Sequence, residues 1–226
     1  MPDNNTVSKA TFDFLKELEK NNNKEWFEAN KATFKSHETA AKSFFEMISD
    51  KLSHHDEIEK MKMFRIYRDV RFSKDKTPYK THLAASFSRL GAQLRGGYYI
   101  HLKPGGSFLA TGFWDPNKED LFRIRKELEM DAEEFRKTIN QKSLKSVWGE
   151  IQGDALKTMP KGFDKEHPDI DLIKLKQFIF VRNFTDKEVL SGSFLEEVDK
   201  SYRAIRPYFD LMSNILTTDL NGESVL

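Results

Sequence analysis

The chain of 226 residues is long enough to bury a core, and its length fits one domain or at most two small ones. Hydrophobic residues make up 38% of it and aromatic residues 12%, which excludes a disordered chain, while a net charge of +1 and a pI near 7.8 argue against a dedicated nucleic-acid-binding domain. Because there is no cysteine, disulfides, thiolate nucleophiles and cysteine-ligated zinc are excluded as well.

The sequence carries no membrane or export signal. No apolar run approaches the roughly 20 residues that a helix needs to cross a bilayer. The first residues, MPDNNTVSKATFDF, lack the basic and apolar regions of a signal peptide. We therefore expect a cytoplasmic protein with no membrane partner.

The N-terminal part is predicted to be helical over residues 8–55. Ser8 or Thr11 can cap a short first helix, and the asparagines at 21–23 mark its end and a restart. A longer amphipathic helix then runs to about Leu52. The apolar face of this longer pattern consists of Trp26, Phe27, Phe34, Ala41, Phe44, Phe45 and Ile48.

From residue 61 to 114 the apolar side chains alternate, which predicts mainly antiparallel strands. The short apolar segments bounded by turn residues are FRIYR (64–68), HLAASFS (82–88), GYYIHLK (97–103) and SFLATGFW (107–114). The last two are joined by Pro104-Gly105-Gly106, which predicts a compact hairpin.

The remaining third returns to helical periodicity. We expect helices over 117–150, a loop followed by a strand over 156–184, and a final helix over 193–216 with a break near Arg206, because Pro207 lies inside its pattern. The fold prediction is a single α+β domain over 1–226, with a central antiparallel sheet packed by N-terminal and C-terminal helices.

The charge is concentrated in one stretch. Residues 61–103 hold ten Lys or Arg against two Asp or Glu, a local +8 that leaves −7 for the rest of the chain. Within the stretch, Arg68 and Arg71 offer planar forks for phosphate or carboxylate, and Lys76 and Lys80 add point charge. Tyr79 can stack on a base or sugar. This predicts a basic patch that binds an anion; in the alternative, the cations pair with the protein's own carboxylates, while Phe72 and Tyr79 fill the core.

Two histidines accompany the basic stretch. His82 follows it directly, and His101 shares a face of the strand GYYIHLK with Tyr99. Antiparallel neighbours can bring the two together as an acid–base pair or as ligands of a divalent metal, with Asp69 orienting a cation or a histidine. The alternative for each histidine is a half-buried side chain bonded to a carbonyl.

Four segments together resemble the domain-of-unknown-function family 2461 of bacterial and fungal proteins. They are FLKELEKNNNKEWFEANK (14–31), RDVRFSKDKTPYKTH (68–82), GGYYIHLKPGGSFLATGFW (96–114) and PKGFDKEHPDIDLIKLK (160–176). The resemblance implies a single α+β domain and carries over no catalytic residues. The positions that match its motifs are Arg68, Asp69, Arg71, Phe72, Lys76, Pro78, Tyr79, Lys80, Thr81, His82, Tyr99, His101 and Lys176.

The leading functional hypothesis is a binding or catalytic site for a phosphate- or carboxylate-bearing small ligand on a basic face of the sheet. Its predicted catalytic residues are His82, His101 and Asp69, and its ligand-binding residues are Arg68, Arg71, Lys76, Lys80, Tyr79, Tyr99 and Lys176. The alternatives are nucleic-acid binding without catalysis, or an interaction domain whose basic segment pairs with acidic surfaces. The residues leave open whether catalysis occurs, and they predict neither a cofactor nor an oligomeric state.

Overall fold

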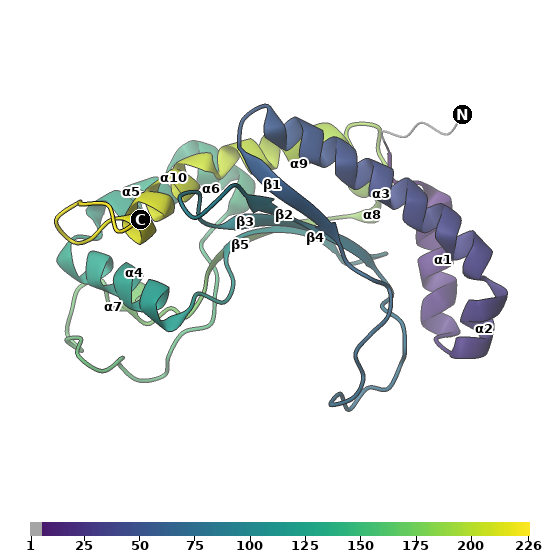
Figure 1. The fold of residues 1–226 in the computed structure, drawn as a ribbon, viewed down its shortest axis with the longest axis horizontal. Coiled ribbons are helices and arrows are strands. Elements are labelled where there is room, and N and C mark those ends of the chain that lie inside the picture. Colours follow the sequence, from purple (N-terminus) through teal and green to yellow (C-terminus); the bar gives the residue numbers. More distant parts are fainter. Residues whose placement is uncertain (1–5) are drawn as a thin grey trace. The chain divides into compact units, whose positions relative to one another are not determined.

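The computed structural model describes residues 6–226, and its centre is a five-stranded antiparallel sheet in which consecutive strands are neighbours (Figure 1). The α+β prediction is confirmed. The strands are β1 (Ile58–Met63), β2 (Leu83–Arg89), β3 (Gly97–Leu102), β4 (Ser107–Phe113) and β5 (Phe178–Phe184).

The described chain forms two compact units. The first contains residues up to Phe87, with Tyr99–Leu109 and Asn183–Lys200; the second contains Ser88–Tyr98, Ala110–Arg182 and Ser201–Leu226. Strands β2 to β5 each contribute residues to both units. No helix in residues 6–226 combines the length and the apolar character needed to span a membrane.

The first two helices of the first unit begin at residues that cap them. The hydroxyl of Ser8 accepts from the backbone of Thr11 at the start of α1 (Lys9–Lys20), and the side chain of Asn23 accepts from Trp26 N at the start of α2 (Lys24–Ala29). The predicted stop and restart at residues 21–23 is thus confirmed. The long helix α3 (Lys31–Ser53) packs on β1 (Figure 1).

The first strand lies six residues earlier than predicted. Residues 64–68 were expected to form it, whereas β1 is the charged segment IEKMKM at 58–63. The side chains of Glu59, Lys60 and Lys62 are exposed, and the other three residues of the strand are only half-buried. Residues 64–68 form no continuous strand; Tyr67 alone forms an isolated antiparallel bridge, with Tyr79.

Around residue 190 the first unit contains a short helix, α8 (Asp186–Val189), that the sequence analysis missed. Its capping box is complete: Thr185 and Glu188 bond each other's backbone N–H groups. After it, α9 (Phe194–Ala204) ends one residue before α10 (Arg206–Thr217), which carries Pro207 in its first turn. The predicted break near Arg206 is confirmed.

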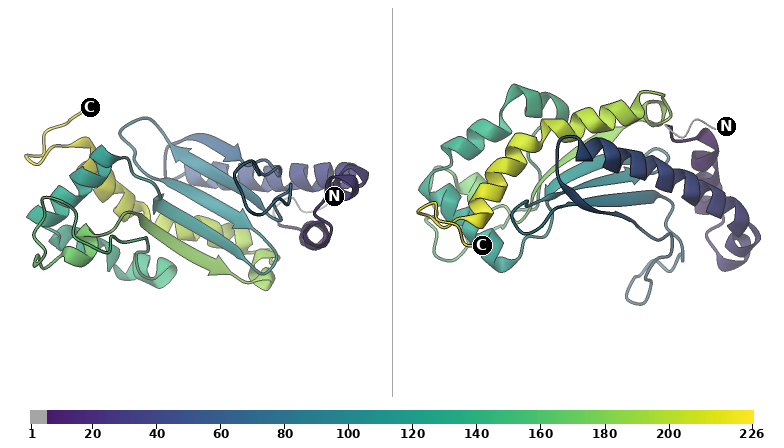
Figure 2. Two further views of the ribbon diagram at one scale, coloured as in Figure 1. Left: turned by 90° about the horizontal axis from the view of Figure 1, so that it is seen from below. Right: turned by 45° about the horizontal axis from the view of Figure 1, so that its top comes forward.

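In the second unit, helices surround α10. Asn117 caps α4 (Lys118–Met130), which is followed by α5 (Glu133–Ile139), α6 (Lys142–Trp148) and α7 (Ile170–Ile173). Helix α10 packs on α4 and α5 (Figure 2). Its Tyr208 is fully buried and donates to the carbonyl of Phe178 (3.0 Å), so the phenol has a partner despite its burial.

One glycine in β4 is required by its neighbours. Gly112 has φ +112°, and a Cβ built on it would lie 2.3 Å from the carbonyl oxygen of Phe178. Only glycine adopts this backbone conformation without strain and leaves room for that oxygen.

Candidate functional site

A polar pocket of about 500 Å³ lies in the first unit at the basic stretch. Its walls come from the end of α1, the turn after it, the segment preceding β2 and the residue after β3. The lining residues are Glu19, Asn22, Arg68, Asp75, Thr77, Tyr79, Lys80, Thr81, His82 and Lys103. We call this the Arg68 pocket.

Arg68 is held in the wall by its own loop. Its guanidinium donates to the carboxylate of Asp75 and to the hydroxyl of Thr77. Asp75 also accepts from the backbone N–H (2.9 Å) and hydroxyl (2.8 Å) of Thr77. These bonds, that from Arg68 first, lower the pKa of Asp75 to about 2, so the carboxylate is ionised at neutral pH and fixes the guanidinium in place.

Two lysines complete the cationic lining. Lys80 Nζ donates to the carbonyl of Arg65 (2.8 Å) and lies 5.6 Å from the ring centre of Phe64; burial, and to a lesser extent the charge of Arg65, lowers its pKa. Lys103 Nζ lies 3.2 Å from Oε1 of Glu19. Arg68 and Lys103 therefore have carboxylate partners, whereas Lys80 donates to a neutral carbonyl.

The structure brings His82 and His101 together across β2 and β3, as antiparallel pairing predicted. Their ring centres lie 4.0 Å apart, and the Tyr99 hydroxyl lies 3.0 Å from Nδ1 of His101. His101 also stacks on Phe108, with ring centres 4.6 Å apart. His82 faces the Arg68 pocket, and within residues 6–226 no hydrogen bond engages its ring nitrogens.

Both imidazoles are neutral at neutral pH. Burial lowers the pKa of His82 to about 3, and the charges of His101, Lys80, Lys103 and Arg68 act in the same direction. Burial followed by the charge of Lys103 lowers the pKa of His101 to about 4. The pocket therefore places an unprotonated base in a positive field. No group of three or more His, Asp or Glu in the described part of the chain is arranged to hold a metal ion.

Asn22 fixes the opposite wall. Its side-chain amide donates to the carbonyl of Tyr79 (2.9 Å) and accepts from the backbone N–H of the same residue (3.1 Å). The Tyr79 ring is only 4% exposed and stacks on Phe27, with ring centres 4.0 Å apart. Tyr79 therefore offers the pocket little aromatic surface.

Several predicted site residues do not line this pocket. Arg71 forms two hydrogen bonds with the carboxylate of Asp69 (2.9 and 2.6 Å), and Lys76 Nζ donates to the carbonyl of Val70 (2.9 Å). These contacts hold together the loop 69–76, which extends away from the strands (Figures 1 and 2). Phe72 in this loop is 96% exposed, which contradicts the expectation that it fills the core. Lys176 belongs to the second unit, where it lies 3.4 Å from Asp154.

The sequence comparison agrees with the motifs. The family described as "conserved hypothetical protein (DUF2461)" matches residues 10–211. The chain belongs to the DUF2461 family. All residues that line the Arg68 pocket fall inside the matched range. No curated protein and no solved structure matches the chain.

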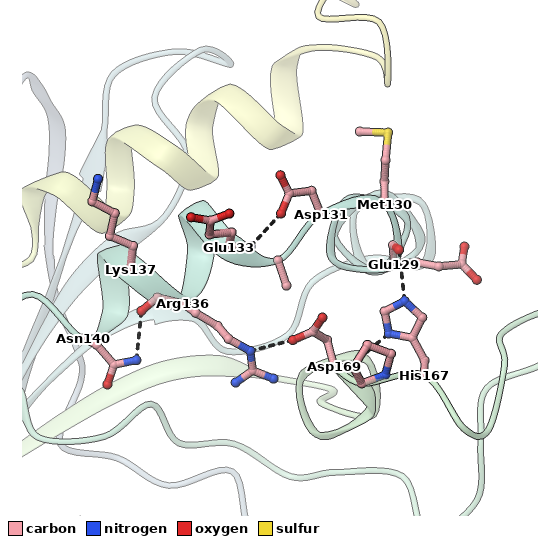
Figure 3. A pocket seen from close by; sticks show the side chains of 11 residues that line it. Glu129, Met130, Asp131, Glu133, Arg136, Lys137, Asn140, His167 and Asp169 are labelled. Atoms are coloured by element: carbon pink, nitrogen blue, oxygen red, sulfur yellow. Dashed lines mark hydrogen bonds and ion pairs between the residues drawn. The ribbon is translucent and has the colours of Figure 1, made fainter.

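A second pocket, of about 730 Å³, lies in the second unit of this DUF2461 chain (Figure 3). Its polar groups bond one another. Arg136 pairs with Asp169 (2.5 Å) and Asp171 (2.7 Å), and the His167 ring bonds the carbonyl of Glu129 (3.1 Å) and the backbone N–H of Asp169 (3.1 Å). Both ring nitrogens of His167 thus bond backbone groups, so this histidine is less available to a ligand than His82 in the Arg68 pocket.

Sequence reasoning left six lining residues out of the predicted site: Glu19, Asn22, Asp75, Thr77, Thr81 and Lys103. Glu19 and Asn22 looked like parts of a helix and its stop signal, and Lys103 was the last residue of the predicted strand 97–103. The one available signal was the asparagine run at 21–23, since three asparagines exceed what a helix stop needs. The contacts that bring these side chains to the basic stretch join residues 57 or more positions apart, as Asn22 and Tyr79 show.

Proposed function

We propose that the Arg68 pocket binds a small ligand bearing a phosphate or carboxylate group, with Arg68, Lys80 and Lys103 contacting the anion. The observation that carries the proposal is the convergence of three cationic side chains on one pocket of about 500 Å³: Arg68 and Lys80 from the segment preceding β2, and Lys103 directly after β3. Like charges repel, so their collection around a cavity is stabilised when an anion occupies it. Arg68 supplies two-point hydrogen bonding, and Lys80 supplies a charge that forms no ion pair with a carboxylate within residues 6–226.

His82 is the acid–base group of this proposal. It lies at the pocket surface as a neutral imidazole, and the ring of His101 behind it, bonded to Tyr99, restricts its orientation. A neutral imidazole accepts a proton from a nucleophile, and the adjacent cations stabilise negative charge that develops on a phosphoryl oxygen. Hydrolysis or transfer at phosphorus is the reaction class that suits these groups. Asp69 and Arg71 lie outside the pocket lining and take no part in this proposal.

The test is a ligand-induced shift in thermal unfolding. Inorganic phosphate and sulfate should raise the Tm of the wild-type chain, and Arg68→Met or Lys103→Met should abolish the shift. Arg71→Met is the matched control, because Arg71 comes from the same stretch and pairs with Asp69 outside the pocket. The proposal is wrong if no anion stabilises the wild type, or if Arg71→Met removes the shift as fully as Arg68→Met.

Nucleic-acid binding is the second candidate, and one observation favours it. Phe72 is 96% exposed and Tyr67 is 48% exposed, both within the basic stretch, and exposed aromatic rings among cations can stack on unpaired bases. Binding of a fluorescent single-stranded oligonucleotide should then weaken steeply with salt and with Phe72→Ala. The affinity of the Arg68 pocket for a single phosphate should depend much less on salt concentration and should not depend on Phe72. Binding to acidic proteins but to neither ligand would indicate an interaction domain instead.

A further inference from the structure

We infer that the ligand of the Arg68 pocket is a phosphorylated polyol, such as a sugar phosphate, and not a nucleotide. This inference rests on the proposed anion site and names the class of ligand that the rest of the lining fits. It follows from the size of the pocket, from the polar groups that face the cations, and from the small aromatic surface that the lining offers.

The pocket has more room than an anion alone needs. Its volume of about 500 Å³ falls in the range of pockets that hold whole small molecules. Three cations suit the three terminal oxygens of a phosphate monoester, whereas a carboxylate has only two oxygens to offer. The remaining space then surrounds the group to which the phosphate is attached.

Hydroxyl groups match that remaining space. Besides the cations, the lining consists of two carboxylates, two threonines, an asparagine, a histidine and one buried tyrosine. Both contacts of the Glu19 carboxylate, with Lys103 (3.2 Å) and Thr81 (3.5 Å), involve Oε1, which leaves Oε2 to accept from a ligand hydroxyl. A hydroxyl both donates and accepts, so it can bond a carboxylate and a lysine or threonine at once. A polyol therefore satisfies this mixed lining better than an apolar group would.

A nucleobase finds little to stack on. The two rings in the lining are Tyr79 and His82. Tyr79 is almost completely buried against Phe27, and one side of His82 contacts His101. The lining contains no Phe, Trp, Leu, Ile, Val or Met side chain. A nucleobase placed here would be desolvated beside charged side chains, and it would not gain the stacking that nucleotide sites provide.

Isothermal titration with a matched ligand ladder tests the inference. The probes are inorganic phosphate, ribose 5-phosphate, glucose 6-phosphate, AMP, and glucuronate as a carboxylate analogue. We expect the two sugar phosphates to bind at least tenfold more tightly than inorganic phosphate and than glucuronate, and AMP to bind no more tightly than ribose 5-phosphate. The inference is overturned if AMP binds tenfold more tightly than ribose 5-phosphate, or if the sugar adds nothing to phosphate. The second result leaves the anion site standing, whereas binding of none of the probes rejects both proposals.

Glu19→Gln is expected to affect the binding of sugar phosphate and of inorganic phosphate differently. Loss of the carboxylate should weaken sugar-phosphate binding, because the charged acceptor of a ligand hydroxyl is replaced by a neutral amide with a single acceptor oxygen. It should leave inorganic phosphate binding unchanged or stronger, because a negative charge beside Lys103 is gone. The control is Glu17→Gln, since Glu17 lies on the same helix, pairs with Lys20 and does not line the pocket. Equal changes for phosphate and sugar phosphate in Glu19→Gln would contradict the inference.

Discussion

The imidazole rings of His82 and His101 lie with their centres 4.0 Å apart, and the far side of His101 is bonded to the Tyr99 hydroxyl. Only one of the two, His82, faces the Arg68 pocket. Burial and the surrounding positive charge keep both rings unprotonated at neutral pH, with pKa values of about 3 for His82 and about 4 for His101. The two rings are therefore uncharged in a cationic environment, and lowering the pH should change the free energy of unfolding through them.

Acid is predicted to destabilise the fold through these two histidines. An unfolded histidine titrates near its ordinary pKa of about 6.5, so below that pH the unfolded chain gains protons that the folded chain does not bind. Their contribution to stability is complete above pH 6.5 and is lost as the pH falls toward 4. Each histidine adds at most about 1.4 kcal/mol per pH unit to the slope, and less where solvent screens it. Urea unfolding from pH 7 to 4.5 measures the slope.

His82→Gln and His101→Gln should each flatten that profile. The groups that shift the His82 pKa from neighbouring segments are His101, Lys80, Lys103 and Arg68, and they remain in the His82→Gln variant. His54→Gln serves as the control, since His54 is an exposed side chain at the end of α3. If the dependence of stability on pH is unchanged in both histidine variants, the folded rings take up protons as readily as the unfolded ones.

Arg68 and Arg71 should each control the pKa of one carboxylate. Arg68→Met is expected to raise the pKa of Asp75 from about 2 toward its ordinary range, because the hydrogen bond from Arg68 is the largest cause of its depression. Arg71→Met should do the same for Asp69. Carboxyl carbon shifts in an NMR titration report both groups. Each variant is the control for the other, and a rise of the Asp75 pKa in Arg71→Met would mean that the loop does not hold these pairs apart.

Asn22→Ala should destabilise the protein by about 1–3 kcal/mol, because it removes two hydrogen bonds to the Tyr79 backbone. Asn22→Asp should do no better, since a carboxylate oxygen would then face the carbonyl of Tyr79. Chemical denaturation measures both. Asn21→Ala is the control, with one exposed bond to the carbonyl of Glu17, and it should cost less than about 1 kcal/mol. Equal losses at the two asparagines would contradict the role assigned to Asn22.

Gly112→Ala should cost more than about 2 kcal/mol, because the new methyl group meets the carbonyl oxygen of Phe178 at 2.3 Å and the backbone is strained for any side chain. Gly106→Ala is the comparison, since the nearest atom to its added Cβ is Lys103 Cδ at 3.8 Å. We expect this control to stay within about 0.5 kcal/mol of the wild type in the same unfolding assay. A tolerated alanine at 112 would mean that β4 and β5 can shift apart at this point.

Periodicity and capping predicted most of the fold, because each signal is local. The caps at Ser8 and Asn23, the hairpin between β3 and β4, and the break near Arg206 depend on residues within a few positions of one another. The position of β1 could not be predicted in the same way. Its segment IEKMKM is short of the β-branched and aromatic residues that mark strands, and its pairing with β2 and packing on α3 decide its conformation.

The sequence predicted which kinds of side chain form the candidate site, but not which individual residues line it. Arg68, Lys80 and His82 were identified from one stretch, and the pairing of His82 with His101 followed from neighbouring strands. Arg71 has the same chemistry as Arg68, yet the loop 69–76 turns it toward Asp69. The ligand roles of the cations stay predictions that the binding experiments above address, and the catalytic role of His82 stays a prediction. Nothing in a local pattern distinguishes the two arginines, because the difference arises from the path of the loop.

The pairing of Asn22 with Tyr79 has a consequence for how molecules of this protein meet. Tyr79 bridges Tyr67 through hydrogen bonds made by its neighbours, Pro78 and Lys80, so its own N–H and C=O point away from that partner. Unpaired backbone groups of this kind are a template on which a strand from another molecule can add. The Asn22 amide bonds both groups, so neither the N–H nor the C=O of Tyr79 is available to a strand of another molecule.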